Sequence, residues 1–146
     1  MLKGIHPLLH ADLLHVLASM GHGDELVIAD ANFPSASVGK RLIQLPARTA
    51  PDALEAILTL FPIDAAATPG AITMKVAGSD ANLLEPTREL AAVLSGHVPA
   101  VTMGSLERHE FYARARNAFA VIRTGELRRF GNILLVKGVV TRYPPV

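Results

Sequence analysis

Residues 20–34 read Met20-Gly21-His22-Gly23-Asp24-Glu25-Leu26-Val27-Ile28-Ala29-Asp30-Ala31-Asn32-Phe33-Pro34. A histidine between two glycines precedes a short apolar run, and an aspartate ends that run. Such a run, with β-branched residues and turn signals on both sides, is typical of a buried strand. His22 then lies at the mouth of the strand and Asp30 at its far end, where side chains reach a cleft. A proton-transfer group and a hydroxyl-binding carboxylate on structured turns suit chemistry on a small polyol.

The composition predicts one domain that buries apolar surface between subunits. The 146 residues are 50% hydrophobic and 18% charged, and the mean hydropathy is +0.32. A chain of this length forms one domain with a substantial core. So few charges leave apolar surface that a monomer would expose to water, which favours a homo-oligomer.

Charge and cysteine content disfavour several classes of protein. The formal net charge is only +1, and acids interrupt the arginines of residues 114–129, so we expect no nucleic-acid partner. The absence of cysteine fits a cytoplasmic location and excludes thiolate chemistry. We expect no membrane association, because the N-terminal residues do not resemble a secretory leader and no apolar run approaches the ~20 residues of a membrane span.

The histidines near the N-terminus do not form a metal-binding pattern. His10 and His15 are five residues apart, which is about 140° around a helix, so they do not share a face. No second cluster of ligands accompanies them and His6. We therefore expect no metal site.

Strand and helix signals alternate along the chain, which predicts an α/β fold in a single layered domain. Helices are expected at residues 12–20, 51–61, 86–94 and 106–117. The first three end at Gly21, Pro62 and Gly96. Strands are expected at residues 26–29, 71–76, 98–103, 118–123 and 133–136. Residues 31–50 predict a long functional loop with one short strand at 42–43.

Several motifs follow one another in a recognisable order. They are Met20-Gly21-His22-Gly23-Asp24-Glu25, Ala29-Asp30 with Asn32-Phe33-Pro34, Glu110-Phe111-Tyr112, Ala118-Phe119-Ala120-Val121, Thr124-Gly125-Glu126, and Gly131-Asn132-Ile133-Leu134 before Lys137-Gly138-Val139. Together they resemble the L-fucose mutarotase branch of the D-ribose pyranase family. The resemblance implies a mutarotase-like domain at residues 1–140 and a C-terminal tail at 141–146.

The resemblance implies a fold of the ribose pyranase and fucose mutarotase type. It also implies a cofactor-independent isomerase that interconverts the α and β anomers of L-fucose or a related free monosaccharide. The assembly would be a ring-shaped homo-oligomer, commonly a decamer, with sites at subunit contacts. Pyranose–furanose isomerisation of D-ribose and a non-catalytic sugar-binding subunit stay open as alternatives. The Asn32-Phe33-Pro34 and Glu110-Phe111-Tyr112 motifs favour the fucose branch, and His22 argues against binding alone.

The resemblance further implies roles for individual residues. His22 would be the proton donor, and Asp30 would bind the sugar. A basic residue before the Phe-Tyr pair would contact the sugar, either Arg108 or the adjacent His109. The family's Tyr-Gly-Asn stands here as Phe130-Gly131-Asn132, so stacking on the sugar survives, while any hydrogen bond of the tyrosine hydroxyl is lost.

Each of these residues also has an ordinary structural explanation. His22 would then cap a turn, and Asp30 would begin a loop. Arg108 would pair with glutamates on an exposed helix, and Tyr112, a further candidate for the edge of the site, would only pack, as would Phe130. The chemistry favours a functional His22, because mutarotation takes a proton from the anomeric hydroxyl and gives one to the ring oxygen. Histidine exchanges protons near neutral pH.

Overall fold

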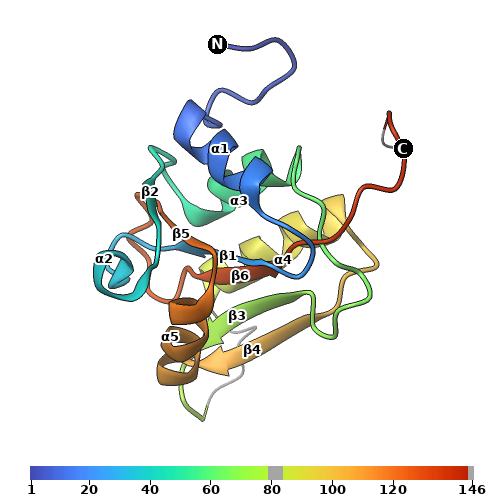
Figure 1. The fold of residues 1–146 in the computed structure, drawn as a ribbon. Coiled ribbons are helices and arrows are strands. Elements are labelled where there is room, and N and C mark those ends of the chain that lie inside the picture. The colour runs from blue at the N-terminus through green and yellow to red at the C-terminus, as the bar shows by residue number, and fades with distance from the viewer. Residues whose placement is uncertain (79–83, 145–146) are drawn as a thin grey trace.

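One mixed sheet forms the centre of the protein (Figure 1), as seen in a computed structural model that describes residues 1–78 and 84–144. Its strand order is β2-β5-β1-β6-β3-β4. The strands are β1 (Glu25–Ala29), β2 (Leu42–Gln44), β3 (Ala71–Lys75), β4 (Met103–Glu107), β5 (Ala120–Arg123) and β6 (Ile133–Val136). β6 runs antiparallel to its neighbours β1 and β3, whereas the β1–β5, β2–β5 and β3–β4 pairs are parallel.

Helices cover both faces of the sheet, so the fold is a three-layer α/β sandwich (Figure 1). The helices are α1 (Ala11–Ser19), α2 (Ser35–Val38), α3 (Ala50–Leu58), α4 (Glu85–His97) and α5 (Arg108–Asn117). α1, α3 and α4 pack on one face, and α2 and α5 pack on the other. The α/β fold class predicted from the sequence is confirmed.

The predicted strand at 26–29 is the centre of this arrangement. Leu26 and Ile28 point into the core under α1, α3 and α4, while Val27 and Ala29 point into the core under α2 and α5. None of the four is exposed to solvent. Because successive side chains of a strand face opposite sides, a strand covered on both faces must be apolar at every position.

Local signals explain where α3 begins. The Thr49 hydroxyl accepts a hydrogen bond from the backbone amide of Asp52 at 3.1 Å, and Pro51 follows within the first turn. A side-chain acceptor at the cap and an early proline both favour a helix start. The helix expected from residue 51 is therefore present.

Some predicted boundaries are wrong because sheet pairing and packing outweigh local signals. β4 lies at residues 103–107 rather than 98–103, and α5 begins at Arg108 rather than Leu106. β4 pairs with β3 from Ala71↔Met103 to Lys75↔Glu107, which draws the first residues of the expected helix into the sheet.

Two further differences concern helices. α4 continues through Gly96 to His97, because its buried Leu90 and Leu94 offset the roughly 1 kcal/mol that a glycine costs in a helix. The loop expected at 31–50 contains the short helix α2 in addition to the expected strand, which is β2.

The longest helix in the described part of the chain is α4, with 13 residues. No helix among the described residues combines the length and apolar character needed to cross a bilayer. The last two residues of the expected tail, 145–146, lie outside the described residues.

The strand directions give the sheet two distinct ends. At the carboxyl end, the parallel strands β1 to β5 finish and the antiparallel β6 begins, as the pairings Ile28↔Ile133 and Thr73↔Ile133 show for its neighbours β1 and β3. At the amino end, the first residues of the parallel strands lie beside the last residue of β6, as in Glu25↔Val136. Asp30 therefore lies at the carboxyl end and His22 near the amino end.

Candidate active site

A cavity of about 350 Å³ opens at the carboxyl end of the sheet. It is lined by Asp30, Asn32, Phe33, Met74, Arg108, Tyr112, Arg129, Phe130 and Asn132. We call it the Asp30 pocket. Ligands of α/β proteins characteristically bind at the carboxyl ends of the strands, and the volume falls within the range of roughly 300–1,000 Å³ that is usual for small-molecule sites.

Asp30 and Asn132 form a reciprocal pair at the base of the pocket. Asn132 Oδ1 accepts a hydrogen bond from the Asp30 backbone amide at 2.8 Å, and Asn132 Nδ2 donates to Asp30 Oδ2 at 3.0 Å. The other carboxylate oxygen, Oδ1, accepts from the Asn32 amide at 2.9 Å. The antiparallel β1–β6 pairing brings these residues together although they lie 102 positions apart in the sequence.

The Asp30 carboxylate is buried, with 5% of the residue exposed. Burial raises the pKa of this carboxyl above its usual value, against the hydrogen bonds from Asn32, Asn132 and Phe33, and the charge of Glu126 adds to the rise. Each carboxylate oxygen has a second lone pair, so Asp30 can still accept hydrogen bonds from ligand hydroxyls.

Aromatic rings form one wall of the pocket. Phe33 lies edge-on to Tyr112, with 5.2 Å between ring centroids, and edge-on to the buried Phe111 at 6.0 Å. Such contacts hold rings in fixed orientations. Phe130, whose backbone has a positive φ of 62°, is also in the lining, so the pocket offers apolar faces beside the hydrogen-bonding groups of Asp30.

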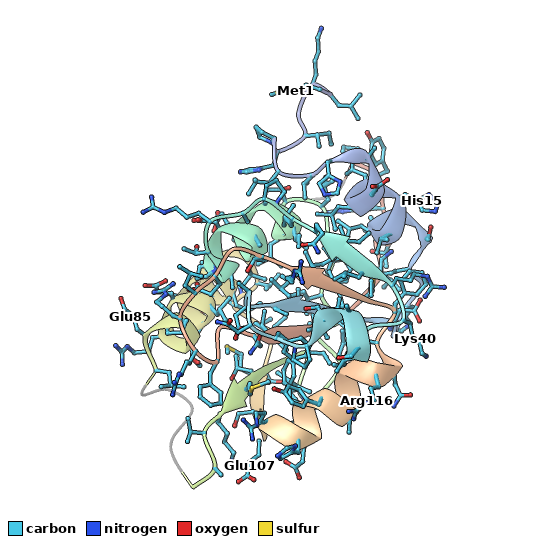
Figure 2. All side chains as sticks on the ribbon, turned by 90° about the vertical axis from the view of Figure 1, so that its left-hand side faces the viewer. Met1, His15, Lys40, Glu85, Glu107 and Arg116 are labelled. Atoms are coloured by element: carbon cyan, nitrogen blue, oxygen red, sulfur yellow. The ribbon has the colours of Figure 1, made fainter. Side chains whose placement is uncertain are left out.

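α5 brings Arg108 and Tyr112 to the pocket. Figure 2 shows α5 running between the labelled Glu107 and Arg116, next to the end of β3. Arg108 and Tyr112 are one helical turn apart and both line the pocket. His109 is outside the lining, and its ring lies edge-on to Tyr112 with 6.1 Å between centroids. Of the two basic candidates, Arg108 is therefore the one that faces the pocket.

Glu126 anchors the segment that carries Phe130, Gly131 and Asn132. Its carboxylate is buried, with 2% exposed, and accepts hydrogen bonds from the Ala50 amide and from the amide and guanidinium of Arg128. Its carbonyl accepts from the Ala31 amide at 2.8 Å, and a Cβ on Gly131 would lie 2.7 Å from its Cγ. Glu126 thus contacts two segments that form the pocket, at Ala31 and at Gly131, but it is not one of the residues that line the pocket.

Arg128 links this segment to α4. Its guanidinium donates to both oxygens of Glu89 at 2.8 Å and to Glu126 at 2.9 Å. Burial alone would raise the pKa of Glu126, but the hydrogen bonds from Arg128 and Ala50 hold it below its usual value. The same carboxylates raise the pKa of Arg128. These bonds anchor the chain two residues before Phe130, whose positive φ is a conformation that costs a non-glycine residue roughly 1–2 kcal/mol.

We expect Glu126→Gln to lower the free energy of unfolding by about 1–3 kcal/mol at pH 7, because a buried charged hydrogen-bond acceptor is lost. The folded-state pKa of Glu126 lies below the ordinary value of 4.5, so its contribution is present above that pH and is lost as the pH falls through the lower folded value. Urea melts at pH 7 and in the acid range measure this.

Glu85→Gln is the matched control for this prediction. Glu85 contacts the same arginine at 3.6 Å, but its side chain is largely exposed, so its loss should change stability by less than about 0.5 kcal/mol. Equal effects of the two substitutions, or a Glu126→Gln deficit that does not shrink in acid, would contradict the assignment.

His22 is separated from the Asp30 pocket by the length of the sheet. The five residues of β1 lie between the two residues and alone span about 17 Å. The His22 side chain is 62% exposed, and its Nε2 lies 3.1 Å from Asp64 Oδ2. His22 borders a separate groove of about 600 Å³ lined mostly by apolar side chains, among them Leu14, Leu17, Leu60, Val139 and Val140. We call this groove and its rim the His22 surface.

The structure thus brings together Asp30, Arg108, Tyr112, Phe130 and Asn132, with Gly131 packed behind them, and leaves His22 apart. Sequence reasoning did not name Asn32, Phe33, Met74 and Arg129 as site residues. The first two share the turn of Asp30, and Arg129 precedes Phe130, so proximity in sequence was a usable signal. Met74 reaches the pocket only through the β3–β6 pairing. Among the described residues, no group of three or more His, Asp or Glu side chains is arranged to hold a metal ion.

A comparison with family models matches residues 3–140 to the RbsD / FucU transport protein family. The chain belongs to this family. An L-fucose mutarotase of Haemophilus influenzae (strain 86-028NP) is 46% identical over 144 residues, which cover 95% of this chain and 97% of the relative. The resemblance to the L-fucose mutarotase branch of the D-ribose pyranase family, predicted from the sequence, is confirmed.

Solved structures of the RbsD / FucU family share the fold. The fucose mutarotase of Streptococcus pneumoniae, in complex with L-fucose, matches with a TM-score of 0.87 at 38% identity, covering 96% of this chain and 100% of that one. Bacillus subtilis RbsD, in complex with D-ribose, matches with a TM-score of 0.70 at 28% identity, covering 95% of this chain and 98% of that one. The match to the fucose mutarotase is closer in both sequence and structure.

Proposed function

We propose that this chain is a cofactor-independent isomerase that interconverts the α and β anomers of L-fucose or a closely related free monosaccharide. The observation that carries the proposal is the Asp30 pocket, in which a buried carboxylate paired with Asn132 faces the aromatic rings of Phe33, Tyr112 and Phe130. A sugar presents hydroxyls on its rim and C–H groups on its faces, and this combination matches both. The similarity to L-fucose mutarotases supports the same activity.

Binding in this pocket follows from the donors and acceptors that line it. Asp30 accepts hydrogen bonds from vicinal hydroxyls through its free lone pairs, and Arg108 offers a planar set of donors. Arg129, exposed beside Phe130, offers a second guanidinium. These groups hold the ring and leave the anomeric carbon to a separate proton-transfer group.

That proton-transfer group is His22, and it comes from a second copy of the chain. Within one chain His22 is about a strand length away from the Asp30 pocket, too far to act on a monosaccharide bound there. The His22 surface supports a contact between copies, since it exposes Leu60, Val139 and Val140 around the histidine. Burial of such a surface removes apolar area from water, which drives association.

The reaction needs one group that both takes and gives a proton. Neutral His22 takes the proton of the anomeric hydroxyl, and the bond between the anomeric carbon and the ring oxygen breaks as a carbonyl forms. The protonated His22 then returns this proton, through a water molecule, to the departing ring oxygen, which becomes a hydroxyl. Rotation about the adjacent carbon–carbon bond presents the other face of the carbonyl, and the reverse proton transfers close the ring. Histidine suits both directions near neutral pH.

Anomer exchange measured by NMR tests the proposed function directly. Inversion transfer between the α and β anomeric protons of L-fucose should be faster with protein than without it. D-ribose, with its pyranose and furanose forms, and a sugar lacking a free anomeric hydroxyl complete the panel. Binding of L-fucose without faster exchange would contradict catalysis and favour a sugar-binding subunit, and faster exchange of D-ribose alone would favour a pyranase.

The shared site predicts a large assembly, and we expect a decamer. Light scattering at micromolar concentration should give a mass many times the 15.5 kDa of one chain, because the exposed apolar residues of the His22 surface favour contact between copies. Leu60→Asp, on that surface, should lower the mass, whereas Leu2→Asp, on the exposed N-terminal arm, is the control. A monomeric wild type would contradict the shared site.

Phe130→Tyr should tighten sugar binding by up to about tenfold with little change in the maximal rate. The added hydroxyl restores one hydrogen bond, worth about 0.5–1.5 kcal/mol, while the stacking contact stays the same. Titration of L-fucose by NMR gives the affinity, and inversion transfer at saturation gives the rate. A rise of the rate by about a hundredfold would instead make that hydroxyl a second proton-transfer group.

A further inference from the structure

Asp64 lies at the amino end of the sheet in the segment between α3 and β3. Its backbone amide donates to the Val136 carbonyl at 2.9 Å, and the neighbouring Ile63 forms a bridge with Lys137. The end of β6 therefore fixes the backbone of Asp64. Neither the Asp30 pocket nor the sequence motifs described above include this residue.

The turn that carries His22 is attached to the same end of β6. The Gly23 amide donates to the Lys137 carbonyl at 2.8 Å, and Gly23 has a φ of 84° that favours glycine. Lys137 Nζ in turn donates to the Leu17 carbonyl at 2.9 Å and to the Met20 carbonyl. His22 and Asp64, 42 residues apart in the sequence, are thus held on one rigid support.

The two oxygens of the Asp64 carboxylate have different hydrogen-bond partners. Oδ1 accepts from the Ala66 amide at 2.9 Å, and Oδ2 lies 3.1 Å from His22 Nε2. The hydrogen bond with His22, followed by that with Ala66, holds the pKa of Asp64 below its usual value, so the group is an ionised acceptor near neutral pH. His22 Nε2 must then carry the hydrogen, which leaves Nδ1 as the basic nitrogen.

We propose that Asp64 is a positioning residue that fixes the tautomer and orientation of His22, so that Nδ1 is the atom that exchanges a proton with the sugar. This inference rests on the proposed catalytic role of His22. The negative charge also stabilises the imidazolium that forms when Nδ1 takes the proton of the anomeric hydroxyl. On an exposed surface such a pair contributes little, but a second copy that covers the His22 surface excludes water and strengthens it.

The substitution Asp64→Asn separates this role from simple folding. The side chain keeps its shape, and its amide oxygen still accepts from the Ala66 amide. The amide NH₂ then faces His22 Nε2, which becomes an acceptor, and the hydrogen moves to Nδ1. Loss of the correct tautomer is the reason why the equivalent change in serine proteases is so damaging.

The experiment measures both the tautomer and the catalysis in the assembled protein. Ring ¹⁵N shifts of labelled histidine, with His22 assigned through His22→Ala, should report Nε2–H in the wild type and Nδ1–H in Asp64→Asn. Anomer exchange at saturating L-fucose should fall by about tenfold or more, while the affinity for L-fucose stays within about twofold, since Asp64 does not touch the sugar. Glu55→Gln is the matched control, because it removes the carboxylate partner of another histidine, His97, at 2.8 Å.

The outcomes distinguish this inference from the proposed function. If His22→Ala keeps the wild-type exchange rate, the catalytic role of His22 fails. If His22→Ala removes the acceleration while Asp64→Asn keeps either the wild-type rate or the Nε2–H tautomer, the role of Asp64 is overturned. An equal loss of rate in Glu55→Gln overturns it as well, because the effect would then not be specific to the His22 pair.

Discussion

His22→Ala should lower the acceleration of anomer exchange by about a hundredfold or more and leave sugar binding nearly unchanged. Positioned acid–base catalysis contributes roughly 10²–10⁴-fold, and His22 is the proposed source of all of it. Asp30 and the aromatic rings that bind the sugar lie at the other end of the sheet. Inversion transfer at saturating L-fucose measures the rate, and a ligand titration measures the affinity.

The fold should survive this substitution. The side chain is 62% exposed in the chain, and among the described residues its hydrogen-bond partner is Asp64. His15→Ala, which removes an exposed histidine of α1, is the control and should keep the wild-type rate. A His22→Ala protein that exchanges L-fucose anomers as fast as the wild type would remove His22 from the mechanism.

The sequence predicted the parts of the fold whose cause is local or repeats with a simple period. β1 is recognisable because a strand covered on both faces must be apolar throughout, and α3 because its cap and proline are adjacent in sequence. β4 was misplaced because its strand character comes from pairing with β3, 32 residues earlier in the register Ala71↔Met103. A single sequence contains no signal for such a partner.

The same distinction between local signals and long-range pairing applies to the site. Asp30 and Asn132 were each named from their own motif, but that they bond to each other depends on the antiparallel direction of β6. Sequence reasoning placed His22 and Asp30 at opposite ends of one strand, which already separates them within one chain. Asp64 was missed because its only link to His22 is spatial, through the end of β6.

Asp30→Asn should weaken the binding of L-fucose by about a hundredfold. Hydrogen bonds to a charged group contribute roughly 1.5–3 kcal/mol each, and the neutral amide loses that strength. An amide also cannot accept both hydrogen bonds that the carboxylate accepts within the protein, because Asn32 donates to one carboxylate oxygen and Asn132 to the other. Whichever way the amide is turned, its NH₂ faces one of these donors. Titration by NMR measures the affinity, and Asp12→Asn, at an exposed position of α1, is the control.

A mixture of the His22→Ala and Asp30→Asn variants provides the sharpest test of the shared site, measured at an L-fucose concentration too low to fill the Asp30→Asn pocket. In a site built from two copies, the His22→Ala chain contributes an intact Asp30 pocket and the Asp30→Asn chain contributes an intact His22. In a random assembly of equal amounts, half of the pockets carry an intact Asp30, and half of those receive an intact His22 from the neighbouring copy. About a quarter of the wild-type activity should therefore return, since every interface in a symmetric ring is equivalent. Refolding the chains together and apart, followed by inversion transfer, measures this. If both groups acted within one chain, every chain in the mixture would lack one of them and no activity would return. Activity near one quarter is the result that only a histidine donated across the interface explains.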